Sequence, residues 1–344
     1  MATSDYLSGA DLTGVARGGV INESVMQRIW NISKIPLPFT DMIGTGTHDN
    51  AYASWVQDTL QAQNLSNAAV DGQDLTSYTN IPPSLRVGNQ SQISVKAVAV
   101  SERAQNSAAI GGNALAYQLM MRQQELKRDI EGIMLTGQAS VADDGNTAAG
   151  KSGGLGSWLV TNTSFGATGS AGGYSTATGL TVAPTYGTKR AGSESTLRDL
   201  LQAVWTQGGN PTTLMSVPAV IRKLSSYMFT STAQVATLME DVGTSKTGAT
   251  AKGSVNVFVT DFGITVEMVA NRLQPVEVAG EAALYILDPS LLEISYLKGV
   301  NVEDMAKTGL ADKRMMSADW TLKVLQEKGL GGYFDLDITL AWTA

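Results

Sequence analysis

The clearest pattern of apolar positions is helical and runs from Asn113 to Leu135. Its apolar residues recur at spacings of three, four and seven, which places them on one face of an α-helix. They are Leu115, Leu119, Leu126, Ile130 and Ile133. Asn113 is a suitable N-cap, and Lys127 is expected to form an i,i+4 ion pair with Glu131 on the polar face. At 1.5 Å per residue the segment gives a rod of about 35 Å, which predicts a helix that acts as the backbone of its domain.

A second unit with helical periodicity begins at Ser193. Leucine and valine residues between 197 and 204 share one face of the predicted helix, and Thr196 with Asp199 resembles a capping box. The short apolar stretch TTLMSV then predicts a buried strand. Another helix is expected at 218–228, because proline is favoured at the first helical position.

The apolar residues of the C-terminal part alternate, which is the period of β-strands. The segment SVNVFVTDFGITVEMV predicts a hairpin with Asp261 in its turn. Asp288 and Pro289 mark a turn between two apolar runs, and further strands are predicted within 319–342. Helices and strands together predict an α+β architecture.

The first 96 residues are too poor in apolar positions to form a core of their own. Residues 1–48 hold one helix-like piece at 22–30 and the closely spaced Pro36 and Pro38, which we expect to impose an extended backbone. This segment is predicted to be an arm. Residues 49–96 alternate weakly around a Pro-Pro turn, which predicts an extended, two-stranded loop.

Composition narrows the functional classes. The 31 acidic and 24 basic residues give a net charge of −7, which argues against a protein that grips nucleic acid through a basic surface. No run of 18 apolar residues and no secretory signal is present, so we expect a chain made in the cytosol without membrane contact. The absence of cysteine excludes disulfides, thiolate zinc sites and cysteine nucleophiles.

One stretch, GNTAAGKS, matches the phosphate-loop pattern at Gly145, Gly150, Lys151 and Ser152. A working phosphate loop requires a buried strand before it and a helix that starts at the lysine. The preceding GQASVADD has one isolated valine and two aspartates that would repel a triphosphate, and the following GGLGS is too rich in glycine to start a helix. We therefore predict a chance match and no nucleotide cofactor. The surrounding segment 137–192 is rich in Gly, Ser, Thr and Ala and is expected to be a long surface excursion.

Other candidate catalytic or metal-binding side chains are sparse. His48 is the only histidine, so it cannot build a multi-histidine metal site, and its turn-like surroundings predict a solvated loop residue without a role. The carboxylate pairs Asp143–Asp144 and Glu240–Asp241 lie beside glycine and small polar residues, which favours solvated loop charge over metal ligation. We predict no catalytic residue, no metal site and no enzymatic activity.

Four segments of the chain resemble the major head proteins of short-tailed bacteriophages. They are RVGNQSQISVKAVAVSE (86–102), YQLMMRQQELKRDIEGIML (117–135), ALYILDPSLLEISYLKG (283–299) and AKTGLADKRMMSADWTLKVLQEKG (306–329). Their order and spacing agree with that family across nearly the whole chain.

The resemblance implies a Hong Kong 97-type capsid fold with four parts. These are an N-terminal arm at 1–48, an extended loop at 49–96, a peripheral domain formed by 97–192 and 281–344, and an axial domain at 193–280. The predicted helix at about 113–135 would be the spine of the peripheral domain. One departure is that no lysine lies between Lys34 and Lys96, so the loop cannot supply the lysine used for covalent chain-linking in the type member of the fold.

The same resemblance implies a virion protein that assembles with itself in the host cytoplasm. Its pentamers and hexamers would form an icosahedral shell around packaged double-stranded DNA, without sequence-specific binding. A portal protein is an expected partner, and a separate scaffolding protein and a decoration protein are further candidates. Two alternatives stay open: an encapsulin-type compartment with the same fold and an enzyme cargo, and, third, a nucleotidase.

Overall fold

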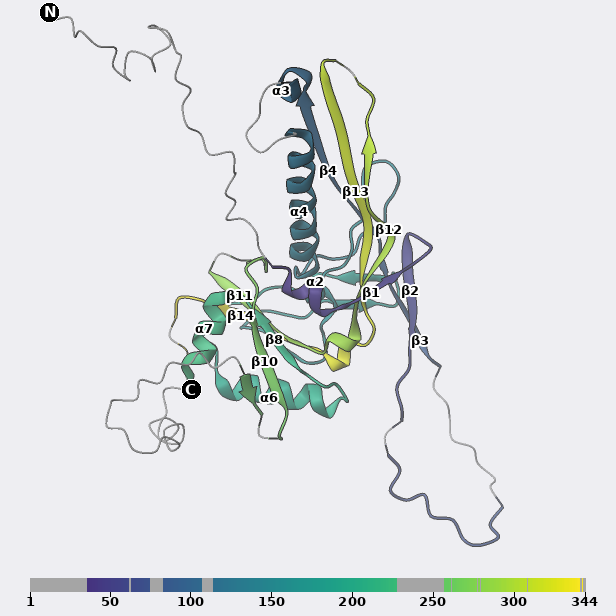
Figure 1. Ribbon diagram of the computed structural model, residues 1–344. Coiled ribbons are helices and arrows are strands. Elements are labelled where there is room, and N and C mark those ends of the chain that lie inside the picture. Colours follow the sequence, from purple (N-terminus) through teal and green to yellow (C-terminus); the bar gives the residue numbers. More distant parts are fainter. Residues whose placement is uncertain are drawn as a thin grey trace, which may run out of the picture.

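The computed structural model describes residues 36–61, 63–74, 83–106, 114–227, 257–260, 262–276, 278, 280–307, 309–340 and 342. Four features expected from the sequence lie outside the described residues: the helix at 22–30, the cap at Asn113, the pair Glu240–Asp241, and Asp261. The fold mixes helices and strands, as the sequence predicts, and Figure 1 shows an upright unit, a lower unit and a loop that projects away from both.

Two sheets form the framework. The four-stranded sheet has the order β1 (Gly44–Thr47), β12 (Leu292–Asp304), β13 (Ala311–Val324) and β4 (Gln92–Ser101), with β1 parallel to β12 and the other pairs antiparallel. The six-stranded sheet has the order β5 (Thr163–Ser164), β14 (Gly331–Asp337), β11 (Glu281–Leu287), β8 (Thr213–Ser216), β10 (Thr265–Ala270) and β9 (Val257–Val259). Two separate hairpins complete the strands: β2 (Tyr52–Gln57) with β3 (Leu85–Gln90), and β6 (Gly173–Ser175) with β7 (Leu180–Val182).

The long helix predicted at 113–135 is confirmed as α4 (Ala114–Met134). It lies along β4 and β13 in the upright unit, and the short α3 (Glu102–Asn106) links β4 to it (Figure 1). Three residues of its predicted apolar face, Leu115, Leu126 and Ile130, are buried, and Leu119 and Ile133 are partly buried. The apolar stripe therefore faces the four-stranded sheet and the central core.

The two helices predicted in the lower unit are also present. They are α6 (Glu194–Thr206) and α7 (Pro218–Tyr227), and both contribute buried leucine and valine residues to a core on the six-stranded sheet. The capping pair expected at Thr196 and Asp199 is wrong, because the helix begins three residues before the position that it implies. Ser193 is the N-cap, without a side-chain cap hydrogen bond, and Thr196 lies inside the first turn. Glu194 instead pairs with Arg198 one turn later, at 2.5 Å.

The prolines before the four-stranded sheet do not both impose an extended backbone. Pro38 starts the five-residue helix α2 (Pro38–Met42), so the expectation of extended chain at this position is wrong. Proline fits the first turn of a helix because the N–H that it lacks would have no partner there. The helix buries Phe39 completely in the central core.

Glu131 does not belong to an exposed polar face, so the ion pair expected with Lys127 is also wrong. Glu131 is fully buried, whereas Lys127 is exposed. The carboxylate accepts hydrogen bonds from Phe39 N and Thr40 N, both at 3.3 Å, and from Asn271 Nδ2 at 2.7 Å. Burial raises the pKa of Glu131, and these hydrogen bonds oppose that shift. The side chain thus joins α4 to α2 and to the end of β10.

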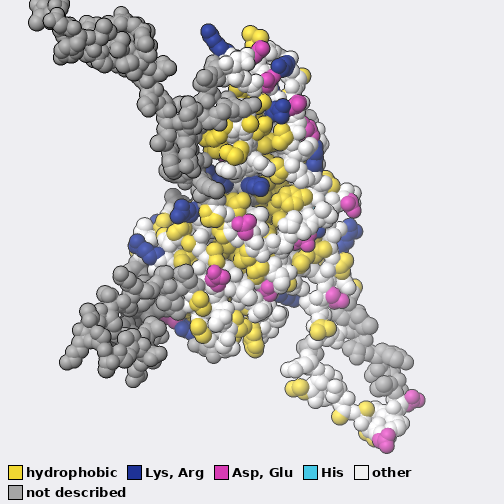
Figure 2. All heavy atoms as spheres, viewed as in Figure 1, with side chains coloured by type: hydrophobic (Ala, Val, Ile, Leu, Met, Phe, Trp, Pro, Cys, Tyr) yellow, Lys and Arg dark blue, Asp and Glu magenta, His cyan; other side chains and the backbone are white. Residues whose placement is uncertain are grey.

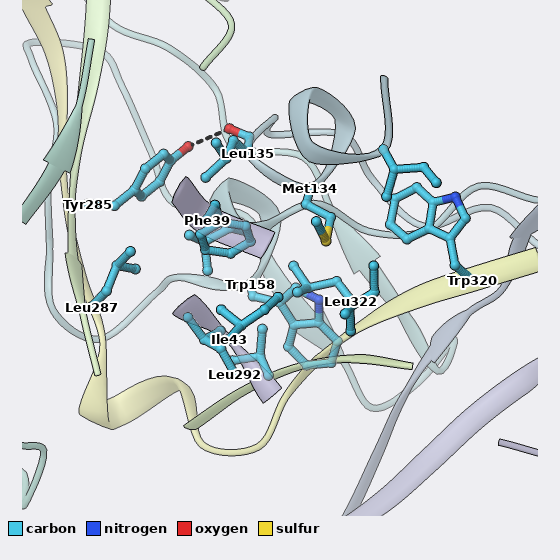
Figure 3. Packing of buried hydrophobic residues seen from close by; sticks show 14 of the residues in the cluster. Phe39, Ile43, Met134, Leu135, Trp158, Tyr285, Leu287, Leu292, Trp320 and Leu322 are labelled. Carbon is cyan, nitrogen blue, oxygen red and sulfur yellow. Dashed lines mark hydrogen bonds between the residues drawn. The ribbon is translucent and has the colours of Figure 1, made fainter. Parts of the chain in front are cut away.

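The segment 137–192 is not a surface excursion throughout, which corrects the expectation from its composition. It contains the four-residue helix α5 (Leu155–Trp158), all of whose residues are buried, and Figure 3 shows Trp158 among the core side chains near Ile43, Leu292 and Leu322. The small residues allow close packing: a Cβ at Gly154 would lie 2.3 Å from Thr136 O. At Gly154 glycine therefore marks close contact rather than exposure.

Candidate assembly surface

The most prominent surface feature is the loop between β2 and β3, residues 58–84, which we call the extended loop. The two strands pair antiparallel with Gln57 opposite Leu85, so a two-stranded loop is present as the sequence predicts. Among its described residues, Leu60 is 100%, Leu65 87% and Val70 76% exposed. Figure 2 shows apolar side chains spaced along this projection and acidic side chains at its far end.

The root of the extended loop is fixed to the rest of the fold. Trp55 donates its ring N–H to Val324 O at 3.1 Å. Asn89 is fully buried; its amide nitrogen donates to Leu322 O at 2.8 Å, and its oxygen accepts from Gly153 N at 2.8 Å. An anchored root with exposed apolar side chains along the projecting loop is an arrangement that can be completed by a surface outside the chain.

Two further exposed apolar features lie on the four-stranded sheet. Strand β4 is at the edge of the sheet, and its side facing away from α4 exposes Ile93 (61%) and Val95 (49%). The turn between β12 and β13 exposes Leu310 (81%) and Met305 (45%). Unpaired edges with apolar side chains are sites where another chain can associate. The part of the chain that the structure describes therefore offers several separate apolar contact surfaces.

Sequence reasoning missed the anchoring role of Asn89 and the apolar outer side of β4. Asn89 lies in RVGNQSQ, where asparagine beside glycine is typical of a turn. Alternation in QISVKAVAVS predicts a strand, but it does not tell which of its two faces the chain itself covers. A buried amide that is satisfied by residues far away in sequence leaves no local signal.

The residues of the phosphate-loop match are arranged for structure rather than for phosphate. Asp144 accepts hydrogen bonds from the N–H groups of Asn146, Thr147 and Ala148, each at 2.8 Å, so a carboxylate already occupies the position of an anion in this turn. These hydrogen bonds lower the pKa of Asp144. Ser152 is buried and its hydroxyl oxygen accepts from Leu322 N at 3.2 Å.

The glycines and the lysine of the phosphate-loop match do not converge on one point where a phosphate could bind. Gly145 has a φ of 70°, which a glycine adopts without strain. Lys151 is exposed and forms a backbone bridge with Val141, and a Cβ at the preceding Gly150 would lie 3.0 Å from Ser91 O. Within the described residues no helix begins at Lys151 or Ser152; the nearest one begins at Leu155. This geometry supports the interpretation of a chance match.

We expect no ATP binding by this chain. The reason is that Asp144 occupies the turn and would repel the phosphates of the nucleotide. Isothermal titration of the protein with ATP and Mg²⁺ should give no heat beyond dilution, and Lys151→Ala should give the same trace. Measurable binding that Lys151→Ala abolishes would restore the nucleotidase hypothesis.

His48 is half-buried rather than fully solvated, which modifies the expectation for it. It follows β1, and its ring nitrogens lie 3.0 Å from Ser295 Oγ and 3.4 Å from Ser91 Oγ. Burial lowers the pKa of His48, and the positive charge of Lys323 lowers it further. The neutral ring is therefore favoured in the folded protein.

This pKa shift predicts a pH dependence of stability. A histidine whose folded pKa lies below its unfolded value contributes stability that is fully present above about pH 6.5 and is lost as the pH falls towards the folded pKa. The melting temperature of His48→Gln should therefore fall less than that of the wild type when the pH is lowered from about 7 to about 5. Melting temperatures of both proteins across this range provide the measurement; identical pH profiles would contradict the shift.

Among the described helices, none has both the length and the apolar character of a membrane span.

The sequence of this chain is similar to those of known capsid proteins. The family model described as SU10 major capsid protein matches residues 7–337. The major capsid protein of Escherichia phage Phieco32 is 37% identical over 103 residues, which cover 30% of this chain and 29% of that protein.

Solved structures share the fold at low sequence identity. The capsid of a native GTA particle matches with a TM-score of 0.60 at 11% identity, covering 93% of this chain and 97% of that one. A Mycobacterium phage Adephagia structure matches with a TM-score of 0.57 at 12% identity, covering 97% and 99%. The SrpI encapsulin from Synechococcus elongatus matches with a TM-score of 0.52 at 13% identity, covering 96% and 98%. At these identities the structural likeness shows the fold alone.

Proposed function

Because the chain belongs to the SU10 major capsid protein family, and is thus a structural protein of a phage capsid rather than an enzyme, we propose that it builds the icosahedral head around packaged double-stranded DNA. Pentamers and hexamers of this chain are the units of the proposed shell. The observation that carries the proposal is the extended loop, whose root is anchored by Asn89 and Trp55 while Leu60 and Leu65 are exposed.

The contact surfaces are suited to a ring. The extended loop projects from one side of the fold, whereas the outer side of β4 and the turn at 305–310 lie elsewhere on it (Figure 1). Different patches on one subunit make heterologous contacts, and such contacts close into rings when the rotation between neighbours is right. Each of the three exposed apolar side chains of the loop, if buried on a neighbour, contributes about 1.5–3 kcal/mol to association.

Charge supports an enclosed rather than a bound genome. The net charge of −7 gives the shell few phosphate contacts, so packaged DNA would lie inside it without being held in place. We also propose the finer features that the resemblance implies: a head of a short-tailed phage, assembled in the host cytoplasm, with a portal protein as partner. A separate scaffolding protein and a decoration protein complete the proposed set.

The division of the chain into four parts is part of the same proposal. The arm takes residues 1–48, the extended loop with its flanking strands 49–96, and the axial domain 193–280, and the rest forms the peripheral domain with α4 as its spine. The four-stranded sheet and α4 lie together in the upright unit, which is consistent with a peripheral domain (Figure 1). Strand β4 starts at Gln92, so the last residues of the 49–96 range pair with β13.

Electron microscopy of the expressed chain tests the proposal. Closed icosahedral particles are expected, either from the chain alone or with proteins encoded beside it. Monomers or small open rings under all conditions, infected cells included, would contradict it. The encapsulin match makes a compartment with enzyme cargo the second candidate. Mass spectrometry and nucleic-acid analysis of particles separate the two, since DNA and a portal indicate a phage head and a single enriched enzyme indicates a compartment.

A further inference from the structure

The six-stranded sheet is covered on one face only at its β9–β10 edge. Phe258 and Val266 are buried there, in the core that α6 and α7 form on this sheet. Neighbouring residues along a strand point to opposite faces of the sheet. The other face therefore carries four residues, all of them exposed, which we call the bare face: Val257, Val259, Thr265 and Glu267.

The bare face is partly apolar. Val257 is 43% and Val259 56% exposed, and they lie directly opposite Glu267 and Thr265 in the antiparallel pair. The solvated face of an antiparallel sheet normally carries polar side chains, so two outward valines on one short strand depart from that pattern. Strand β9 is also the last strand of its sheet. Such an edge is a place where another chain can associate.

Glu267 is the one charged residue of the bare face. Its carboxylate forms no ion pair and no side-chain hydrogen bond within the described residues. Its backbone N–H donates to Thr212 O at 2.8 Å, and the residue pairs with Thr213 of β8. The backbone of Glu267 is thus held by the sheet, while its carboxylate has no partner in its own chain.

The outer side of α7 has complementary properties. Val220 and Leu224 are buried against the sheet, whereas three residues on the opposite side of the helix are exposed. They are Pro218, Ala219 and Arg222, spaced three and four residues apart and therefore neighbours on the helix surface. We call them the α7 face. It is a nearly flat surface with a single long cationic side chain.

Arg222 has no partner within the described part of the chain. No ion pair or side-chain hydrogen bond involves its guanidinium there. The next residue, Lys223, is directed inward instead, where its Nζ donates to Asp337 O at 3.0 Å. A guanidinium can donate two parallel hydrogen bonds to one carboxylate, so an exposed carboxylate is a suitable partner for Arg222.

We propose that the bare face of one copy packs on the α7 face of a second copy, with Glu267 paired to Arg222 across the contact. The two surfaces cannot meet within one chain, because they lie on opposite faces of the same sheet. The contact covers the bare face with a helix, which is the usual partner of a sheet. Pro218 and Ala219 are small enough to let the valines approach, and the opposite charges fix the register.

The proposed contact is heterologous, so each copy offers one surface to the copy before it and the other to the copy after it. Both surfaces belong to the lower unit, where α7 and β10 lie (Figure 1). Contacts of this kind close into a ring when the rotation between neighbours is right. This inference rests on the proposed assembly of the chain with itself, and it does not involve the extended loop.

Cross-linking tests the contact directly, because the chain has no cysteine of its own. Thr265→Cys and Ala219→Cys place one thiol on each surface. With a short bismaleimide the double variant should give a ladder of trimers and larger covalent species. Each single variant should stay monomeric on a denaturing gel, since neither surface meets its own copy. Dimers from a single cysteine would overturn the proposal in favour of a two-fold contact.

A charge exchange tests the pair itself. Arg222→Glu and Glu267→Arg should each lower the yield of assembled particles at least about tenfold, because like charges then face each other. Combining the two should restore the yield. The control combines Glu267→Arg with Lys127→Glu, which has the same net charge and should not be restored. Circular dichroism checks that all variants fold. A double exchange no better than either single one would overturn the pair.

The two experiments separate this inference from the proposed function. Shells of the double-cysteine variant that give no covalent ladder would overturn the contact in favour of a different partner for the bare face, and the shell would stand. A ladder from chains that never form shells would support the contact and contradict the shell.

Discussion

Replacing residues 58–84 with Asn-Gly is expected to give a folded chain that forms no shells. Gln57 and Leu85 are directly opposite in the β2–β3 ladder, so a two-residue turn closes the hairpin without changing its register. The root contacts of Trp55 and Asn89 remain. What the variant loses is the set of exposed apolar side chains that we propose to lie on a neighbouring subunit.

The expected loss of association is large. Leu60, Leu65 and Val70 together contribute about 4 kcal/mol or more to each contact between two subunits. Their removal should lower the association constant of that contact about a thousandfold. Particle yield by sedimentation and electron microscopy is the measurement, with circular dichroism to confirm folding. A full-length chain with serine at these three positions is the control for loop length. Normal shells from the shortened chain would show that the extended loop has no part in assembly.

The sequence predicts the helices well where their apolar face meets the chain itself. The spacing from Leu115 to Ile133 predicts α4, and the leucines of α6 are buried as their period requires. The same reasoning gives the β9–β10 hairpin. In each case one face packs on other elements of the same chain, so the period of the pattern equals the period of burial.

Prediction fails where a residue type has two physical uses. Glycine favours exposed turns and also permits close backbone packing, and the stretch around Trp158 uses the second property. Proline both restricts an extended chain and starts helices, and Pro38 starts α2. Composition alone does not distinguish these uses, because the difference lies in what the rest of the chain places beside the residue.

The candidate site was predictable only in outline. Weak alternation around the prolines indicates a two-stranded loop, and its poverty in apolar residues indicates that it has no core of its own. Neither property reveals that Asn89 anchors it through Leu322 and Gly153. These contacts join residues far apart in sequence and depend on strand register.

Glu131→Ala is expected to lower the free energy of unfolding by about 2–4 kcal/mol, because it leaves buried donors without an acceptor. Asn271 Nδ2 and the N–H groups of Phe39 and Thr40 all donate to this carboxylate. The cost of burying the charge, which raises the pKa of Glu131, offsets part of the loss. The core contact of α2 through Phe39 should loosen as well.

Assembly would conceal this loss, because subunit contacts stabilise the folded chain. The measurement therefore belongs in the Asn-Gly loop variant, by denaturant unfolding followed through tryptophan fluorescence. Lys127→Ala is the control: Lys127 is exposed on the same helix, and its removal should change stability by less than about 0.5 kcal/mol. Equal small effects of both substitutions would mean that Glu131 lies on a solvated face after all. A large effect of Glu131→Ala alone would place it where α4, α2 and β10 are held together.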